Sequence, residues 1–162
     1  MRARRGQSML YAVLLLPTLM LIFALAIDIG LLQMQQLRLR WAVDMATVDA
    51  ATVVDATAYG QTGRLQIDPA LAPGTARQYL YLNLARLGTS VGGDNGAFTI
   101  ARDADISVIN QVPARDPYSG AVLDRPAICA RIRVPYRMSL FPLLGGFGTN
   151  QLTITSNAEV KS

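Results

Sequence analysis

A long uncharged apolar run near the N-terminus constrains this chain more than any other feature. Residues 9–27, MLYAVLLLPTLMLIFALAI, contain no charged side chain and directly follow a cluster formed by Arg2, Arg4 and Arg5. A helix of this length is about 28 Å long, close to the hydrocarbon thickness of a bilayer. Because positive charge before a membrane segment keeps that end inside, we expect a single-pass protein of the inner (cytoplasmic) membrane with a cytoplasmic N-terminus.

A cleaved secretory signal is the alternative interpretation, since it also joins basic residues to an apolar run. However, the run is longer than the roughly 7–15 residues of a signal's apolar region, and helix-prone sequence follows it instead of a small-residue cleavage site. We therefore expect four segments: a basic cytoplasmic leader (1–8), a transmembrane helix (9–32), an extracytoplasmic helical stem (33–60) and a small extracytoplasmic α+β domain (61–162).

The composition argues against several classes of function. The net charge is +4, but three of the fifteen basic residues precede the apolar run, and the remaining twelve stand against eleven acidic ones. The pI near 9.6 therefore reflects membrane topology and not a nucleic-acid surface. The chain has no histidine, the commonest general base and metal ligand, and its single cysteine excludes an intramolecular disulfide. We expect this cysteine, Cys129, to be a buried apolar residue, with a reactive or intermolecular role as the alternative.

The sequence contains no catalytic or metal-binding constellation. Asp103 and Asp105 are the closest acidic pair, and solvated strand ends explain such a pair more often than a calcium site does. Serine and threonine lack a histidine partner, and neither glycine-rich segment has the spacing of a phosphate-binding loop. We therefore expect no enzyme activity, cofactor, metal, small-molecule substrate or nucleic-acid partner.

Helical character continues past the apolar run. No proline interrupts the stem, and Gly60 stands where a C-terminal cap would lie. One apolar stripe recurs at three- and four-residue spacing and consists of Leu37, Trp41, Met45, Val48 and Thr52. Small residues such as Ala46 and Ala50 would let another helix or a sheet approach closely. We predict one helix from residue 9 to about 59, kinked near Pro17.

The second half of the chain changes from helical to strand periodicity. A short helix is predicted over 75–87, with an apolar face. Four later segments alternate apolar and polar residues as half-buried strands do: AFTIA (97–101), ADISVINQV (104–112), AICARIRVPYR (127–137) and QLTITSNAEV (151–160). A hairpin loop (113–126) and an apolar glycine-rich connection (141–148) join the later strands. The predicted fold is α+β: a long N-terminal helix, a short helix and a small antiparallel sheet of three or four strands.

A series of residues around the apolar run occurs in a recognisable order: Arg5, Gly6, Gln7, Pro17, Asp28, Gly30, Leu37, Arg38 and Asp44. In this order, and in the alanine-rich helix that follows, the chain resembles the TadE/TadG-like proteins, pilin-like components of the tight-adherence (Flp) pilus machinery. Segments 127–137, 141–148 and 151–160 are similar to that family's final strands and the loop between them. The resemblance implies a pilin-like fold and packing against other pilin-like or pilus assembly proteins through the N-terminal helix. We expect six residues to take part in helix packing: Tyr11, Pro17, Asp28, Gly30, Ala46 and Ala50.

The resemblance also implies prepilin-type processing, in which a peptidase cuts after a glycine at the cytoplasmic edge of the helix, here between Gly6 and Gln7. Pilins carry a glutamate five residues into the mature chain, where this chain has Tyr11. Because tyrosine lacks the charge that would pair with a neighbour's N-terminus, we expect a minor pseudopilin of a Tad-type (type IV-like) pilus and not a major filament subunit. The alternative is a stand-alone membrane-anchored binding or adhesion module, although a simple anchor has no need of a long helical stem.

Overall fold

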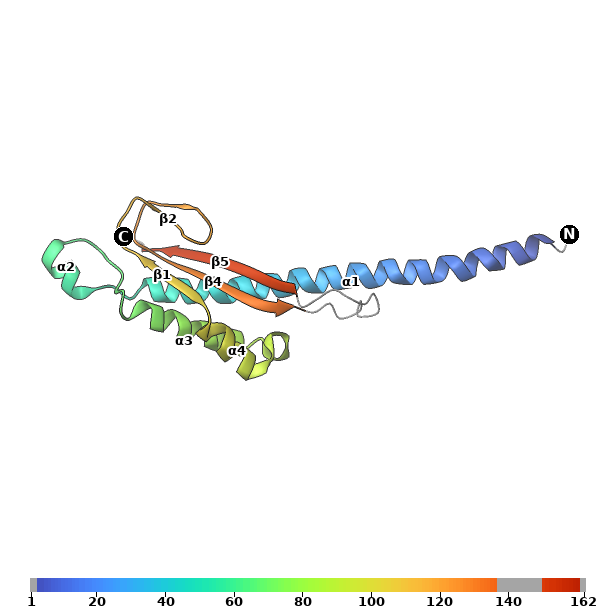
Figure 1. Ribbon diagram of the computed structural model, residues 1–162, viewed down its shortest axis with the longest axis horizontal. Coiled ribbons are helices and arrows are strands. Elements are labelled where there is room, and N and C mark those ends of the chain that lie inside the picture. The colour runs from blue at the N-terminus through green and yellow to red at the C-terminus, as the bar shows by residue number, and fades with distance from the viewer. Residues whose placement is uncertain (1–2, 137–149, 161–162) are drawn as a thin grey trace. The chain divides into compact units, whose positions relative to one another are not determined.

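The computed structural model describes residues 3–136 and 150–160 (Figure 1). The elements in chain order are α1 (Ala3–Ala51), α2 (Ala56–Thr62), α3 (Ala72–Ala85), the 3₁₀ helix η1 (Gly88–Val91), α4 (Gly93–Arg102), β1 (Asp105–Ile109), β2 (Ala114–Arg115), β3 (Val122–Leu123), β4 (Ala127–Tyr136) and β5 (Asn150–Glu159). The chain divides into two compact units, residues 1–34 with 137–150 and residues 35–136 with 151–162. The expected α+β fold, a long apolar helix followed by shorter helices and a small antiparallel sheet, is confirmed.

The first helix ends at Ala51, so the prediction of one helix to about residue 59 is wrong. The next residues, Thr52, Val53 and Val54, form a β-branched run, which favours extended backbone. Val54 pairs with Ile67 in an antiparallel bridge, and the Val53 carbonyl accepts a hydrogen bond of 2.9 Å from the Asp68 amide. The stem helix therefore stops where its backbone gains a partner from the following loop.

A separate short helix, α2, begins at Ala56, inside the end of the segment predicted as stem, and continues to Thr62. The Asp55 carboxylate caps its N-terminus by accepting hydrogen bonds of 2.9 Å from the amides of Thr57 and Ala58. Its C-terminal cap is Gly63, at a positive φ of 65°, and not the expected Gly60. An N-cap aspartate inside a predicted helix was the sequence signal for this new start.

The expected short helix forms as α3 and begins a turn early, at Ala72, with Pro73 in its first turn. Fewer residues of this helix are buried than its predicted apolar face contains, because Tyr79 and Leu82 are exposed. The buried residues are Ala72, Ala76, Leu80, Asn83 and Leu84. The Asn83 side-chain amide donates a 3.3 Å hydrogen bond to the Ala42 carbonyl, which ties α3 to α1.

Residues 97–101, predicted as a strand, belong to helix α4 instead. The buried side chains of Ala97, Ile100 and Ala101 recur at helical spacing, and the helix has an acid in its first turn and Arg102 in its last. Gly96 lets α4 lie directly on the preceding loop, because a Cβ atom there would be 1.9 Å from the Val91 carbonyl oxygen. Tertiary packing thus overrides a five-residue alternating pattern.

The other three predicted strands form one sheet in the order β1-β4-β5. β1 and β4 pair antiparallel with Asp105 opposite Arg131 and Ile109 opposite Ala127, and β5 runs in the opposite direction to β4 (Figure 1). The expected hairpin loop 113–126 contains a second, two-stranded sheet formed by β2 and β3. The apolar connection predicted at 141–148 lies outside the described residues.

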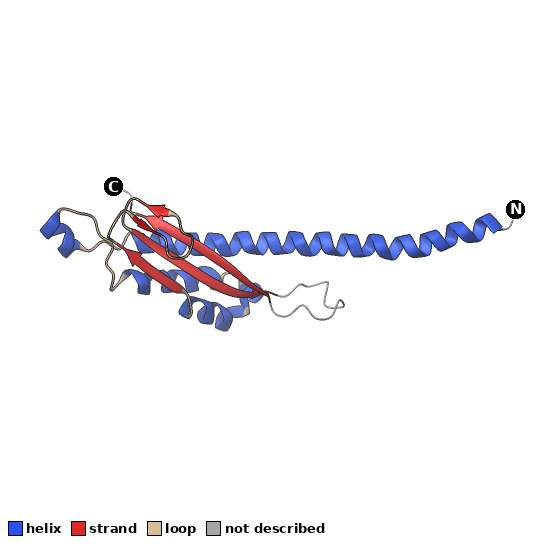
Figure 2. Ribbon diagram, turned by 45° about the horizontal axis from the view of Figure 1, so that its top comes forward, coloured by secondary structure: helices blue, strands red, loops and turns tan. Residues whose placement is uncertain are grey.

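The core lies between one face of the sheet and the helices α1, α3 and α4 (Figure 2). Strand β4 supplies the centre of this face with Ile128, Ala130, Ile132 and Val134. Its alternate residues Ala127 and Cys129 point the other way and are covered by Leu123 and Tyr118 of the β2–β3 region. Both faces of β4 are therefore buried along its first residues, whereas only the helix side is covered further on.

A buried aspartate holds the β2–β3 hairpin against the sheet. The Asp116 carboxylate accepts hydrogen bonds from the Tyr118 amide (2.8 Å), the Asn157 side-chain amide (3.0 Å) and the Ser119 hydroxyl. Burial alone would raise the pKa of Asp116, but these hydrogen bonds outweigh it and hold the pKa below its usual value. The hairpin is thus fixed to β5 by the ionised Asp116 side chain, both of whose oxygens accept hydrogen bonds.

We predict that Gly96→Ala destabilises the fold and that Gly74→Ala does not. The new Cβ at residue 96 meets backbone that cannot rotate away, so the free energy of unfolding should fall by on the order of 1–3 kcal/mol. At Gly74, in α3, a Cβ meets nothing within 4 Å, and alanine should raise the free energy of unfolding by up to about 1 kcal/mol. Thermal unfolding of the full-length protein in detergent, followed by circular dichroism, measures both. Equal melting temperatures for Gly96→Ala and the native chain would contradict the contact.

Candidate functional site

The candidate site is the surface of α1, because its apolar side chains stay exposed over most of its length. Among the described residues, α1 is the one helix long and apolar enough to cross a membrane. Large apolar residues on every side of its N-terminal part are exposed, from Val13 to Leu31. Apolar exposure of this extent is typical of a surface that meets lipid or another protein. The chain thus fits a single-pass membrane protein.

Asp28 differs from its neighbours in this segment. It is only 2% exposed, whereas Ile27 and Ile29 are 53% and 44% exposed. Its side chain takes part in an interaction, so it is not a free charge on the apolar surface. A carboxyl group next to a membrane segment is costly unless it is paired or hydrogen-bonded, which explains why this one residue is turned away from the surface.

The other expected packing residues of this segment lie on its open surface. Tyr11 is exposed, and a Cβ at Gly30 would meet nothing within 4 Å. Pro17 lies inside α1, which continues through it as a helix, and the hydroxyl of Thr18 donates a 2.9 Å hydrogen bond to the Leu14 carbonyl next to this position. The contacts among the described residues therefore do not require a glycine at residue 30.

The expected cleavage position, Gly6 and Gln7, also lies within α1. The structure extends helical backbone to Ala3, so the residues on both sides of this peptide bond are helical. Cleavage there remains a prediction from the resemblance.

Beyond the apolar run, α1 has two different long faces. The inner face is buried in unit 35–136/151–162 and consists of Leu39, Ala42, Val43, Ala46, Thr47 and Ala50. The expected packing residues Ala46 and Ala50 thus lie against the chain's own sheet and helices. The Thr47 hydroxyl on this face is 3.1 Å from the Ser156 hydroxyl of β5, so its polar atom has a partner. Small side chains therefore set the distance between the stem and the sheet.

The outer face carries the larger apolar residues, which remain in contact with solvent. Leu37 is 69% exposed, Trp41 52% and Val48 48%, and Met45 lies between them on the same side. We call Leu37, Trp41, Met45 and Val48 the outer stripe. The spacing in the sequence predicts this stripe, but only the structure shows that it faces away from the sheet.

The described residues offer no competing chemical site. They contain no group of three or more histidine, cysteine or acidic residues that could hold a metal ion. Asp103 pairs with Arg102 at 2.9 Å and Asp105 with Arg131 at 2.7 Å, so the two carboxylates serve separate ion pairs instead of one cation. This contradicts even the minor calcium hypothesis for the pair.

The single cysteine lacks the environment of a reactive thiol. Burial, with the nearby Asp116 carboxylate, raises the pKa of Cys129 to about 12. Since the thiolate is the nucleophilic form, this side chain is an inert member of the core under the hairpin, as expected from its apolar neighbours in the sequence.

Comparison with known proteins bears on the same helix. Residues 6–47 match the family model described as TadE-like protein. Comparisons with curated proteins and with solved structures found no match. The matched segment begins at Gly6, contains the apolar run and ends within the inner face at Thr47, next to Ala46. The resemblance stated from the sequence is confirmed over this range: residues 6–47 are similar to the TadE-like family.

Proposed function

We propose that this protein is a minor pseudopilin, a structural component of a Tad-type pilus assembly system that packs against other pilin-like subunits through α1. A TadE-like segment indicates a component associated with the Tad pilus, and that segment here contains the apolar run and most of the stem. The chain would be anchored in the inner membrane with its N-terminus in the cytoplasm, because Arg2, Arg4 and Arg5 precede the run.

The observation that carries this proposal is the outer stripe. A membrane anchor needs about 20 apolar residues, whereas Val48 lies some 24 Å along the helix beyond residue 32 at 1.5 Å per residue. Leu37 and Trp41 each keep about half or more of their surface open. Covering them would contribute on the order of 1 kcal/mol each at about 25 cal/mol per Å². Another helix lying along the stem would supply that cover.

The role of a minor subunit rests on Tyr11. Its ring is exposed on α1 at the position where pilins place a glutamate, and it has no carboxylate to pair with a neighbour's N-terminus. A subunit without that ion pair would not be repeated along the filament, which leaves it the role of a component that joins or initiates the filament. Gly30, which none of the described contacts requires, would let a neighbouring helix approach closely in the membrane.

Changing the outer stripe tests the packing. Leu37→Gln combined with Trp41→Gln should reduce incorporation into the pilus assembly system several-fold, measured by co-purification with the other pilin-like subunits. Protein abundance should not change, because exposed substitutions alter the free energy of unfolding by about 0.5 kcal/mol or less. Leu71→Gln is the matched control, since Leu71 is also exposed but lies outside α1. Native-level incorporation of the double variant would favour the stand-alone anchored module.

Membrane orientation gives a second prediction. A reporter fused after Ser162 should be active only when it functions outside the cytoplasm, because the basic cluster Arg2, Arg4 and Arg5 directly precedes the apolar run. Cell fractionation should place the fusion in the inner membrane. Activity of a reporter that works only in the cytoplasm would reverse the orientation and remove the pilin-like role.

Processing gives a third prediction. If the prepilin peptidase acts on this chain, the mature protein starts at Gln7, and Gly6→Leu blocks cleavage because a bulky side chain replaces hydrogen beside the scissile bond. Mass spectrometry of the N-terminus in cells with active peptidase measures this directly. An intact Met1 in the native protein would show that the leader is retained.

A further inference from the structure

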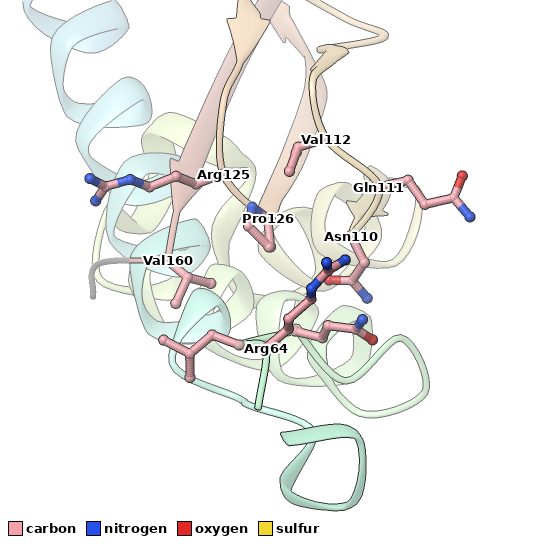
Figure 3. A pocket seen from close by; sticks show the side chains of 9 residues that line it. Arg64, Asn110, Gln111, Val112, Arg125, Pro126 and Val160 are labelled. Atoms are coloured by element: carbon pink, nitrogen blue, oxygen red, sulfur yellow. The ribbon is translucent and has the colours of Figure 1, made fainter. Parts of the chain in front are cut away.

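A pocket of about 600 Å³ lies where β1 ends, β4 begins and β5 ends (Figure 3). Its walls come from four separate parts of the chain: residues 64–66 after α2, residues 110–112 after β1, residues 125–126 before β4, and Val160. This volume is within the usual range for a ligand site. The pocket does not involve the outer stripe of α1.

The frame of the pocket is fixed by one side chain. The Asn110 amide donates a 2.8 Å hydrogen bond to the Ile67 carbonyl, and its oxygen accepts a 2.9 Å hydrogen bond from the Ile67 amide. These two hydrogen bonds join the end of β1 to the loop after α2 in the way that paired backbone hydrogen bonds join neighbouring strands. Ile67 itself is fully buried, so the walls that Asn110 connects are held by the core. The pocket is therefore formed before any ligand arrives.

The charge of the described pocket lining is positive. Two arginines, Arg64 and Arg125, line the pocket, and none of the described lining residues is acidic. Among the described residues, neither arginine belongs to an ion pair. The carboxylates on the adjoining segments accept backbone hydrogen bonds instead: Asp55 caps α2, and Asp68 receives the amides of Ala70 and Leu71.

Arg64 is the cation placed to meet a ligand. Its side chain extends over the pocket beside Asn110 and Pro126, whereas the guanidinium of Arg125 points away from them (Figure 3). Arg125 also lines a neighbouring hollow with Val48 and Thr52, which shares Leu65 and Val160 with this pocket. One guanidinium, with its planar set of N–H donors, is suited to a single carboxylate.

The rest of the lining selects among anions. Leu65, Val112, Pro126 and Val160 give the pocket apolar walls, and the amides of Gln66 and Gln111 flank it. The described lining residues include no aromatic ring on which a sugar could stack, and the single arginine over the pocket is too few for a polyanion. Apolar walls, amide groups and one guanidinium match a peptide with an acidic side chain next to an apolar one.

We propose that this pocket binds a short peptide segment of a partner protein, with a carboxylate side chain on Arg64 and a neighbouring apolar side chain against Leu65, Val112 and Pro126. The proposal goes beyond the pseudopilin role, since it involves no residue of the outer stripe. It gives the domain a recognition site of its own at the loop end of the sheet.

Peptide titration of the full-length protein in detergent micelles tests the proposal. The probe is acetyl-Ala-Val-Asp-Val-Ala-amide at pH 7, followed by the amide signals of residues 64–66 and 110–112 in NMR spectra. We expect saturable shifts in the native protein, and a dissociation constant about tenfold or more higher for Arg64→Gln, because a charged hydrogen-bond partner is lost. Arg77→Gln is the control, since Arg77 is exposed on α3 and does not line the pocket.

Four outcomes would overturn the proposal. They are the absence of saturable binding to the native protein, equal binding by Arg64→Gln with an unchanged spectrum elsewhere, equal binding of the peptide with asparagine in place of aspartate, and binding of inorganic phosphate as tight as that of the peptide. The double variant Leu37→Gln, Trp41→Gln should bind the probe normally. Loss of pilus incorporation with normal peptide binding, or the reverse, separates this proposal from the pseudopilin role.

Discussion

The packing of the inner face of α1 against the sheet and α3 determines the arrangement of the rest of the domain. Ala42, Ala46 and Ala50 are each at most 2% exposed, so small side chains fill this contact and exclude solvent from it. The polar groups caught in this contact are paired, Thr47 with Ser156 and the Ala42 carbonyl with Asn83. Because the inner face is fixed in this way, the rotation of the helix is fixed too. The outer stripe is turned away from the sheet as a direct consequence.

Sequence patterns predicted the elements whose periodicity was long and whose ends were marked. The apolar run, α3 and three strands belong to this group, since each pattern extends over several turns or alternations. The end of α1 was missed because alanine-rich sequence on both sides of Thr52 looks helical, while the bridge between Val54 and Ile67 depends on a loop partner. Helix α4 was missed because a short alternating segment fits either period, and the contact of Gly96 with Val91 decides between them only in three dimensions.

The candidate site was predictable in position but not in orientation. The apolar run and the order of residues from Gly6 to Asp44 located α1 as the functional element, and the family match over 6–47 agrees with that. The stem has two interleaved stripes, however, and spacing alone cannot say which one meets the sheet. The inner stripe combines Leu39 and Val43 with alanines, whereas Leu37 and the larger Trp41 are on the outside. The pocket around Arg64 gave no signal in the sequence, because four distant segments build it and none carries a motif.

Because the buried and the exposed apolar residues lie on different faces of one helix, folding depends on the inner face, and the proposed association would depend on the outer stripe. A substitution on the inner face changes the packing between α1 and the sheet and therefore changes the free energy of unfolding. A substitution on the outer stripe does not alter that packing and changes only the exposed apolar area that a neighbouring helix could cover. Arg38 and Arg40, which are exposed and lie between Leu37 and Trp41 in the sequence, limit the extent of the apolar patch. The stem can therefore fold as part of its own domain and still retain an exposed apolar surface, the one that the proposed association would use.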